Sequence, residues 1–204
     1  MRGAGTAMAA MLAMAALRVG GLEAAQLETK VLAAPRPLAA FALEDHGGRP
    51  FTNERFKGQW SLVLIGFTHC PDVCPFTLDN LALVIEQMST RVSPERLPQV
   101  VFLAVDPDRD RAVLADYVRH FNPGFVGVTG RVEGIKTLVE SLDGYARVVD
   151  RKPGSASYQV QHSAVVSVID PEARVRATLN PPMEPAAAAE FLAGLMRRAM
   201  TEAK

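Results

Sequence analysis

The pattern of hydrophobic and polar positions is dominated by two long apolar runs, at residues 61–67 and 100–105. Their length and β-branched content are typical of strands that are buried on both faces. Between them, apolar side chains recur at helical spacing within residues 76–89, namely Leu78, Leu81, Ala82, Ile85 and Met88. A helix that joins two buried strands makes a βαβ unit, so we expect parallel strands with a right-handed crossover.

Weaker patterns on both sides extend this unit. They predict a hairpin of residues 38–44 with a short strand from residue 50, a helix carrying Leu114, Tyr117, Val118 and Phe121, a strand at 125–128, a helix at 131–142, a strand at 145–150, a hairpin of 164–169 with 174–179, and a helix after Pro185. We expect Asp110 to cap the first of these helices. The order predicts an α/β, thioredoxin-like fold: a central mixed sheet flanked by helices, with an N-terminal hairpin extension.

Composition narrows the choice of partner. The 204 residues suffice for one domain with a sizeable core and a short extension. The formal charge is zero, with 22 basic and 22 acidic residues interspersed, and no basic stripe is visible. We therefore expect no nucleic-acid partner.

The N-terminus has the pattern of an export signal. Arg2 precedes an uncharged, mostly apolar run at residues 7–17, which is too short for a bilayer span of about 20 residues. We expect residues 1–30 to be a signal peptide or a short anchor, residues 31–37 a linker, and residues 38–204 the folded domain. The expected location is the bacterial periplasm, and both release and tethering to the inner membrane are compatible with this segment.

The chain contains two cysteines, Cys70 and Cys74, between the first buried strand and its helix. Helix N-termini favour thiolate over thiol, so reactive or metal-binding sulfurs are expected at such a turn. The alternative is a structural disulfide, which is common in exported chains. A bridge across so few residues would stabilise the fold only modestly, by less than about 3 kcal/mol, which favours the reactive interpretation.

Three segments together resemble the SCO/SenC family of copper-binding proteins, which help to assemble the dinuclear copper centre of cytochrome c oxidase. They are FTHCPDVCP at residues 67–75, VDPDRD at 105–110 and the His162-Ser163 pair. The resemblance covers residues 38–200 and implies that Cys70, Cys74 and His162 bind one copper ion. Thioredoxins carry a proline where this chain has His162, so the histidine separates a copper site from a plain dithiol.

The chemistry of these residues agrees with that implication. Soft thiolates prefer Cu(I), and one imidazole keeps the site usable for Cu(II). The resemblance also places Asp106 and Asp110 near the site as loop-positioning residues. Gln161 stands where family members often carry an acidic group that would orient the ligands or balance their charge. His69 is not expected to bind, because neighbouring side chains at a strand end point to opposite faces.

Two functions follow from the resemblance. One is a metallochaperone that passes copper to the copper-receiving subunit of cytochrome c oxidase, for its CuA centre. The other is a thiol–disulfide oxidoreductase that reduces the cysteines of that subunit, with Cys70 attacking and Cys74 resolving. Further candidate partners are a second copper chaperone and a thioredoxin-like reductant. A peroxide-reducing enzyme is disfavoured, because Phe67 occupies the position where such proteins carry a threonine.

Overall fold

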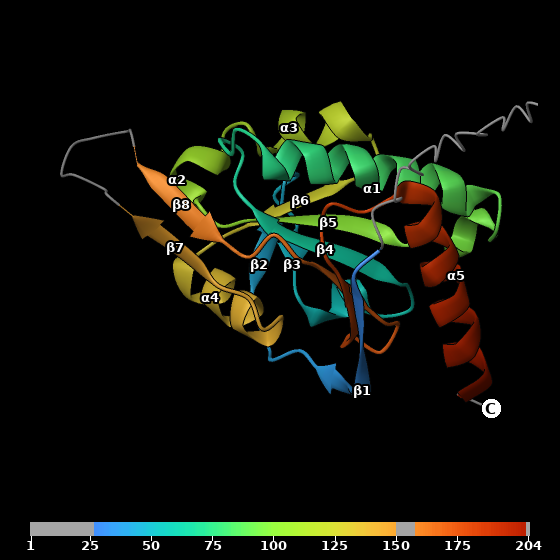
Figure 1. The fold of residues 1–204 in the computed structure, drawn as a ribbon. Coiled ribbons are helices and arrows are strands. Elements are labelled where there is room, and N and C mark those ends of the chain that lie inside the picture. Colours follow the sequence, from blue (N-terminus) through green and yellow to red (C-terminus); the bar gives the residue numbers. More distant parts are fainter. Residues whose placement is uncertain (1–26, 150–157, 203–204) are drawn as a thin grey trace, which may run out of the picture.

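A mixed sheet forms the centre of the structure, a computed structural model that describes residues 27–149 and 158–202 (Figure 1). Within these residues, eight strands pair in the order β1-β10-β9-β4-β5-β6-β2-β3. The pairs β4–β5 and β5–β6 are parallel, and the other neighbours are antiparallel. The expected βαβ unit with parallel strands is therefore present.

The strands of this sheet are short to moderate in length. They are β1 (Thr29–Pro37), β2 (Leu43–Asp45), β3 (Pro50–Phe51), β4 (Ser61–Gly66), β5 (Gln99–Ala104), β6 (Val126–Thr129), β9 (Val166–Ile169) and β10 (Arg174–Leu179). Two further strands, β7 (Ala146–Val149) and β8 (Gln159–His162), pair with each other in a separate sheet. The pair β2–β3 is the expected N-terminal hairpin.

Helices cover both faces of the sheet (Figure 1). They are α1 (Val73–Ser89), α2 (Pro107–Asp110), α3 (Leu114–Phe121), α4 (Val132–Ser141) and α5 (Pro185–Glu202), with 3-10 turns η1 (Asn53–Phe56) and η2 (Pro94–Arg96). Side chains of α1, α3 and α5 pack on one face, whereas those of α4 and η1 pack on the other. In the described part of the chain, no helix has the length and apolarity that a membrane crossing requires.

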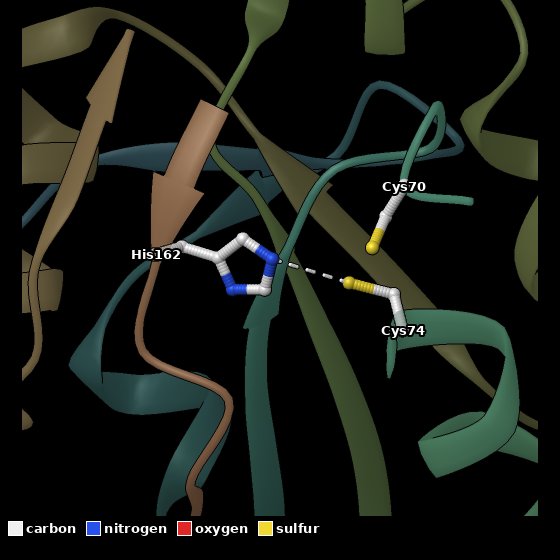
Figure 2. A group of neighbouring side chains, drawn as sticks. All are labelled: Cys70, Cys74 and His162. Atoms are coloured by element: carbon white, nitrogen blue, oxygen red, sulfur yellow. Dashed lines mark hydrogen bonds between the residues drawn. The ribbon is translucent and has the colours of Figure 1, made fainter. Parts of the chain in front are cut away.

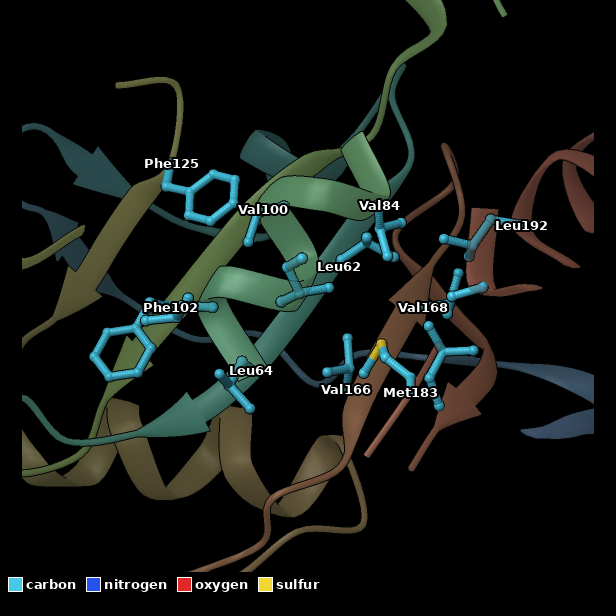
Figure 3. Close-up of a cluster of buried hydrophobic side chains, with 14 of the residues drawn as sticks. Leu62, Leu64, Val84, Val100, Phe102, Phe125, Val166, Val168, Met183 and Leu192 are labelled. Atoms are coloured by element: carbon cyan, nitrogen blue, oxygen red, sulfur yellow. The ribbon is translucent and has the colours of Figure 1, made fainter. Parts of the chain in front are cut away.

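Alternation along β4 divides the core into two layers. Leu62 and Leu64 point toward α1, whereas Val63 and Ile65 point toward α4, and all four are buried. Figure 3 shows the first layer, in which Leu62 and Leu64 lie with residues of β5, β9 and the helices. Burial on both faces explains why these strands are continuous apolar runs in the sequence. Burial of each such side chain stabilises the folded state by about 1.5–3 kcal/mol.

The segment expected to be a linker is a strand. Residues 31–37 belong to β1, which pairs antiparallel with β10 at the edge of the sheet. An edge strand tolerates Pro35 and Pro37, because an N–H that faces outward is not needed for the ladder. The segment expected to be a signal peptide or anchor lies, apart from residues 27–30, outside the described residues.

Strand β8 is a second difference from the predicted elements. The sequence pattern predicts no strand between residues 150 and 164, yet Gln159–His162 pairs with β7 in register, with Ala146 opposite His162. The side chains alternate: Tyr158 and Val160 are buried, whereas Gln159 and Gln161 are exposed. The face that is directed inward therefore includes Tyr158, Val160 and His162.

Candidate metal centre

The cysteines lie on the connection from β4 to α1. Cys70 is in the loop, where its N–H donates to the carbonyl of Phe67 at 3.1 Å, and Cys74 is the second residue of α1. Cys70 therefore precedes the helix and Cys74 lies in its first turn, because α1 begins at Val73. Cys70 is half-buried, Cys74 is buried, and both are free thiols.

His162 ends β8 and faces the two sulfurs (Figure 2). Its Nε2 atom lies 3.5 Å from Sγ of Cys74, and its Nδ1 atom lies 3.0 Å from the carbonyl oxygen of Ser163. A carbonyl oxygen only accepts hydrogen bonds, so the ring proton belongs on Nδ1. Nε2 is then the ring nitrogen directed at the cysteines, and it is the atom through which a neutral imidazole would bind a metal.

The three donor atoms are close enough to share one ion. Sγ of Cys70, Sγ of Cys74 and a ring nitrogen of His162 all lie within 4.8 Å of one another. First-row metals bind sulfur and nitrogen at about 2.0–2.3 Å, so an ion between the donors could reach all three with small side-chain adjustments. Two thiolates and one imidazole suit copper, and a three-donor set leaves room for an incoming ligand.

The two thiols differ in protonation. The pKa of Cys70 is lowered to about 4, first by a hydrogen bond from the Cys74 thiol and further by the N–H groups of Asp72 and Cys74. The pKa of Cys74 is raised, because its thiol donates to Cys70 and is buried. One proton is therefore shared by the pair, with Cys70 as the thiolate and Cys74 as the thiol.

Gly66 allows the sulfur of Cys74 to lie against the end of β4. A Cβ atom at this position would be 2.7 Å from Sγ of Cys74 and 2.5 Å from Cε2 of Phe102. Carbon atoms do not approach these groups so closely, so any other residue would displace the sulfur or the ring. Glycine is needed here for close approach.

Asp110 supports the cysteine loop rather than capping a helix. Its Oδ1 atom accepts hydrogen bonds from the N–H and the hydroxyl of Thr68, at 2.8 and 2.7 Å, and its Oδ2 atom accepts from the N–H of Asp106 at 3.0 Å. It is the last residue of α2, and Val113 stands at the start of α3 without a side-chain cap. The expected N-cap role is wrong because the carboxylate is directed into the interior. The pKa of Asp110 is raised overall, because the effect of burial exceeds the lowering by the hydrogen bonds from Thr68.

Asp106 is also near the site, but it contacts a different segment. Its carboxylate accepts hydrogen bonds from the hydroxyl of Tyr158 at 2.7 and 3.0 Å and pairs with Nε of Arg109. Both expected aspartates therefore lie beside the ligand-bearing segments without reaching the ligand atoms.

Two residues named in the sequence analysis point away from the donors. Gln161 is exposed on the opposite face of β8 from His162, where its Oε1 atom accepts from Nη2 of Arg147 at 2.6 Å. The structure therefore does not bring Gln161 to the ligands, because adjacent side chains of a strand alternate. His69 is exposed and its Nδ1 atom lies 2.9 Å from the Thr68 hydroxyl. It is outside the group formed by Cys70, Cys74 and His162.

Sequence reasoning missed a small apolar cluster next to the site. Phe67, Tyr158 and Val160 pack together, with Cys70 and Val105 against them. The rings of Phe67 and His162 pack edge to face, with 5.7 Å between their centroids. Alternating apolar residues before His162 could have indicated these contacts, but only if residues 158–162 had been interpreted as a strand.

Comparison with known proteins gives consistent matches. A sequence model of the SCO1/SenC family matches residues 31–197. Protein sco1 of Schizosaccharomyces pombe is 37% identical over 150 residues, which cover 71% of this chain and 56% of that protein. A SCO2-like protein of Rickettsia felis is 32% identical over 155 residues, which cover 76% of this chain and 74% of the relative. The chain spans about half the length of several of its eukaryotic relatives.

Solved structures show the same fold. Copper-bound yeast Sco1 has a TM-score of 0.72 at 30% identity, with 80% of this chain and 90% of that chain covered. Copper-bound ScoI of Arabidopsis thaliana has a TM-score of 0.71 at 28% identity, with 78% and 98% covered. The thioredoxin-like arrangement of a mixed sheet between helices is thus confirmed. With its family model matched over most of its length, the chain belongs to the SCO1/SenC family.

Proposed function

We propose that this protein is a copper metallochaperone. Cys70, Cys74 and His162 would hold one copper ion, which passes to the copper-receiving subunit of cytochrome c oxidase for its CuA centre. The observation that carries the proposal is the convergence of two sulfurs and one imidazole within 4.8 Å. Support comes from two relatives of the same fold that were solved with copper bound.

The donor set suits transfer as well as binding. Cys70 is half-exposed, so a partner's thiolate can reach the ion from the side of the loop. Because three donors leave a coordination position open, the incoming ligand can bind before an original one leaves. The paired thiols are needed in reduced form, since a disulfide offers no thiolate to the metal.

Copper titration of the reduced protein tests this proposal. One equivalent of Cu(II) should bind with thiolate-to-copper charge-transfer absorption, and Cu(I) should bind to the same site. Cys70→Ala and His162→Ala should both lose that absorption. His69→Ala is the matched control, because His69 adjoins Cys70 but lies outside the donor group. Binding that survives in His162→Ala and disappears in His69→Ala would overturn the assignment.

The difference between the two thiols favours thiol–disulfide exchange as a second candidate function. The Cys70 thiolate would attack a partner disulfide, forming a mixed disulfide and releasing one partner thiolate. Cys74 would then lose its proton and attack the Cys70 sulfur, which releases the second partner thiolate. Two electrons pass to the partner and a Cys70–Cys74 disulfide remains, which a thioredoxin-like reductant would have to reduce.

His162→Ala separates the two functions. This variant should lose tight copper binding and keep disulfide exchange, because the imidazole is not one of the exchanging groups. Cys70→Ser should lose both activities. Loss of exchange in His162→Ala with unchanged copper affinity would contradict the chaperone and favour the reductase.

We propose that the protein acts in the bacterial periplasm, either released or tethered to the inner membrane. Support comes from the apolar run at residues 7–17 between Arg2 and Arg18. Fusion of residues 1–30 to a reporter enzyme that is active only after export tests the location. An inactive fusion would contradict it.

A further inference from the structure

The histidine of the metal centre is held on a sheet of its own. His162 ends β8, which pairs with β7 and not with the main sheet that carries the cysteine turn. The distance between the imidazole and the sulfurs is therefore not set by a shared strand ladder. The short connection from His162 to β9 of the main sheet and the side-chain contacts of β8 with the rest of the domain set it instead.

Tyr158 makes the most specific of these contacts. It immediately precedes β8, four residues before His162, and its side chain is buried. Its hydroxyl donates to both carboxylate oxygens of Asp106, at 2.7 and 3.0 Å. Asp106 immediately precedes α2, so this bond ties β8 to the loop after β5.

Arg109 holds the same tyrosine from a second direction. Its guanidinium carbon lies 3.7 Å from the centre of the Tyr158 ring, and its Nη1 atom donates to the Tyr158 carbonyl oxygen at 3.2 Å. Its Nε atom pairs with Asp106. Asp106, Arg109 and Tyr158 thus form a closed cluster in which each member contacts the other two.

The same loop also holds the cysteine turn. The N–H of Asp106 donates to Asp110, and Asp110 accepts two hydrogen bonds from Thr68, two residues before Cys70. Residues 106–110 therefore bond to the cysteine turn through one aspartate and to the histidine strand through the other.

We propose that Tyr158 and Arg109 are positioning residues for His162. Through Asp106 they fix β8 at the spacing from the cysteine turn that one copper ion requires. The inference rests on the proposed copper function and extends it to two residues that touch no ligand atom. The Tyr158 hydroxyl keeps the imidazole in place before copper arrives.

A double-mutant cycle with Tyr158→Phe and His162→Ala tests the proposal. Tyr158→Phe removes the hydroxyl and leaves the ring under Arg109. Cu(II) affinity should fall about tenfold or more, as is typical when a group that orients a ligand is lost. In the His162→Ala background the same change should alter affinity by less than about twofold, because Tyr158 acts through the imidazole. Tyr145→Phe is the matched control: it deletes a hydroxyl at the exposed start of the same hairpin.

Hydrogen exchange of the copper-free protein supplies a readout that is independent of metal. Amide exchange at residues 159–162 should speed up in Tyr158→Phe and stay unchanged in Tyr145→Phe. If the wild-type protein bound no copper, the proposed function would fail. Amide hydrogen exchange alone would then show whether Tyr158 and Arg109 hold β8 in place. Unchanged amide exchange together with unchanged Cu(II) affinity in Tyr158→Phe would overturn the inference. So would a loss of Cu(II) affinity on Tyr158→Phe that is equally large in the wild-type and His162→Ala backgrounds. If Tyr158→Phe does not fold, Arg109→Lys replaces it, because lysine keeps the charge but cannot stack on the ring.

Discussion

The Sγ atom of Cys74 and the Nε2 atom of His162 lie 3.5 Å apart, although 88 positions separate the two residues in the chain. Helix α1 presents the sulfur and the end of β8 presents the imidazole. Strand β8 is outside the main sheet, and the loop at residues 106–110 bonds to both segments, through Asp110 to Thr68 and through Asp106 to Tyr158.

Gly66→Ala should lower both stability and copper affinity. The added methyl group would lie 2.7 Å from Sγ of Cys74 and 2.5 Å from the Phe102 ring. Overpacking of this kind costs about 1–3 kcal/mol and would push the sulfur away from His162. Denaturant unfolding and Cu(II) titration measure the two effects.

Gly194→Ala is the control for that change. Gly194 lies in α5, where an added Cβ meets only the flexible side-chain ends of Arg198, at 3.4 Å, and Arg197, at 3.9 Å. Alanine is the better helix former, so stability should rise by up to about 1 kcal/mol with copper affinity unchanged. Equal effects of the two substitutions would show that the close contact at Gly66 is unimportant.

The reduced, copper-free protein should react with iodoacetamide at one site down to about pH 5. The pKa of Cys70 is lowered to about 4, so this sulfur is a thiolate at any pH above that value. An ordinary thiol, with a pKa of about 8.5, would be almost fully protonated at pH 6. Reaction rates followed by mass spectrometry from pH 4 to 9 measure the midpoint.

Cys70→Ser identifies the reacting sulfur in that experiment. Cys74 is buried and its pKa is raised, so the variant should show almost no alkylation at pH 6. A midpoint near 8.5 in the wild-type protein, or rapid reaction of Cys74 in the variant, would contradict the assignment of the thiolate to Cys70.

Thr68→Val should destabilise the cysteine loop. The change removes the 2.7 Å hydrogen bond to Asp110 at nearly constant volume, and bonds to charged groups contribute about 1.5–3 kcal/mol. Because this bond lowers the pKa of Asp110, its loss should raise that pKa further, and NMR of the carboxyl carbon measures the shift. Thr68→Ser keeps the hydroxyl and should behave like the wild type. A lower pKa of Asp110 in Thr68→Val than in the wild type would contradict the role of this hydrogen bond.

Copper should stabilise the folded protein. With free copper at about a hundred times the dissociation constant, the gain is about 2.7 kcal/mol, or roughly 5–10 °C in Tm for a domain of this size. A chelator should remove the gain, and His162→Ala should show a smaller shift at the same copper concentration. Calorimetry of the reduced protein measures it, and identical transitions with and without copper would be evidence against the site.

Much of the fold could be predicted from local pattern. The runs at 61–67 and 100–105 are strands with a helix between them, and the pair β9–β10 forms where the sequence predicts a hairpin of 164–169 with 174–179. The edge strand β1 was harder to predict. Residues 31–37 carry prolines that are typical of a linker, yet they form an edge strand, because pairing with β10 overrides local preference.

By itself, the sequence determined which chemistry the protein can do. The two cysteines at a strand-to-helix turn and the motif around them specify soft metal ligands, because thiolates and imidazole have these properties wherever they occur. The tertiary structure decided which groups meet. In the folded protein His162 lies beside the sulfurs, Gln161 points away from them, and the Tyr158 hydroxyl donates to Asp106. These outcomes depend on the phase of β8 and on long-range packing, which a periodic pattern does not encode.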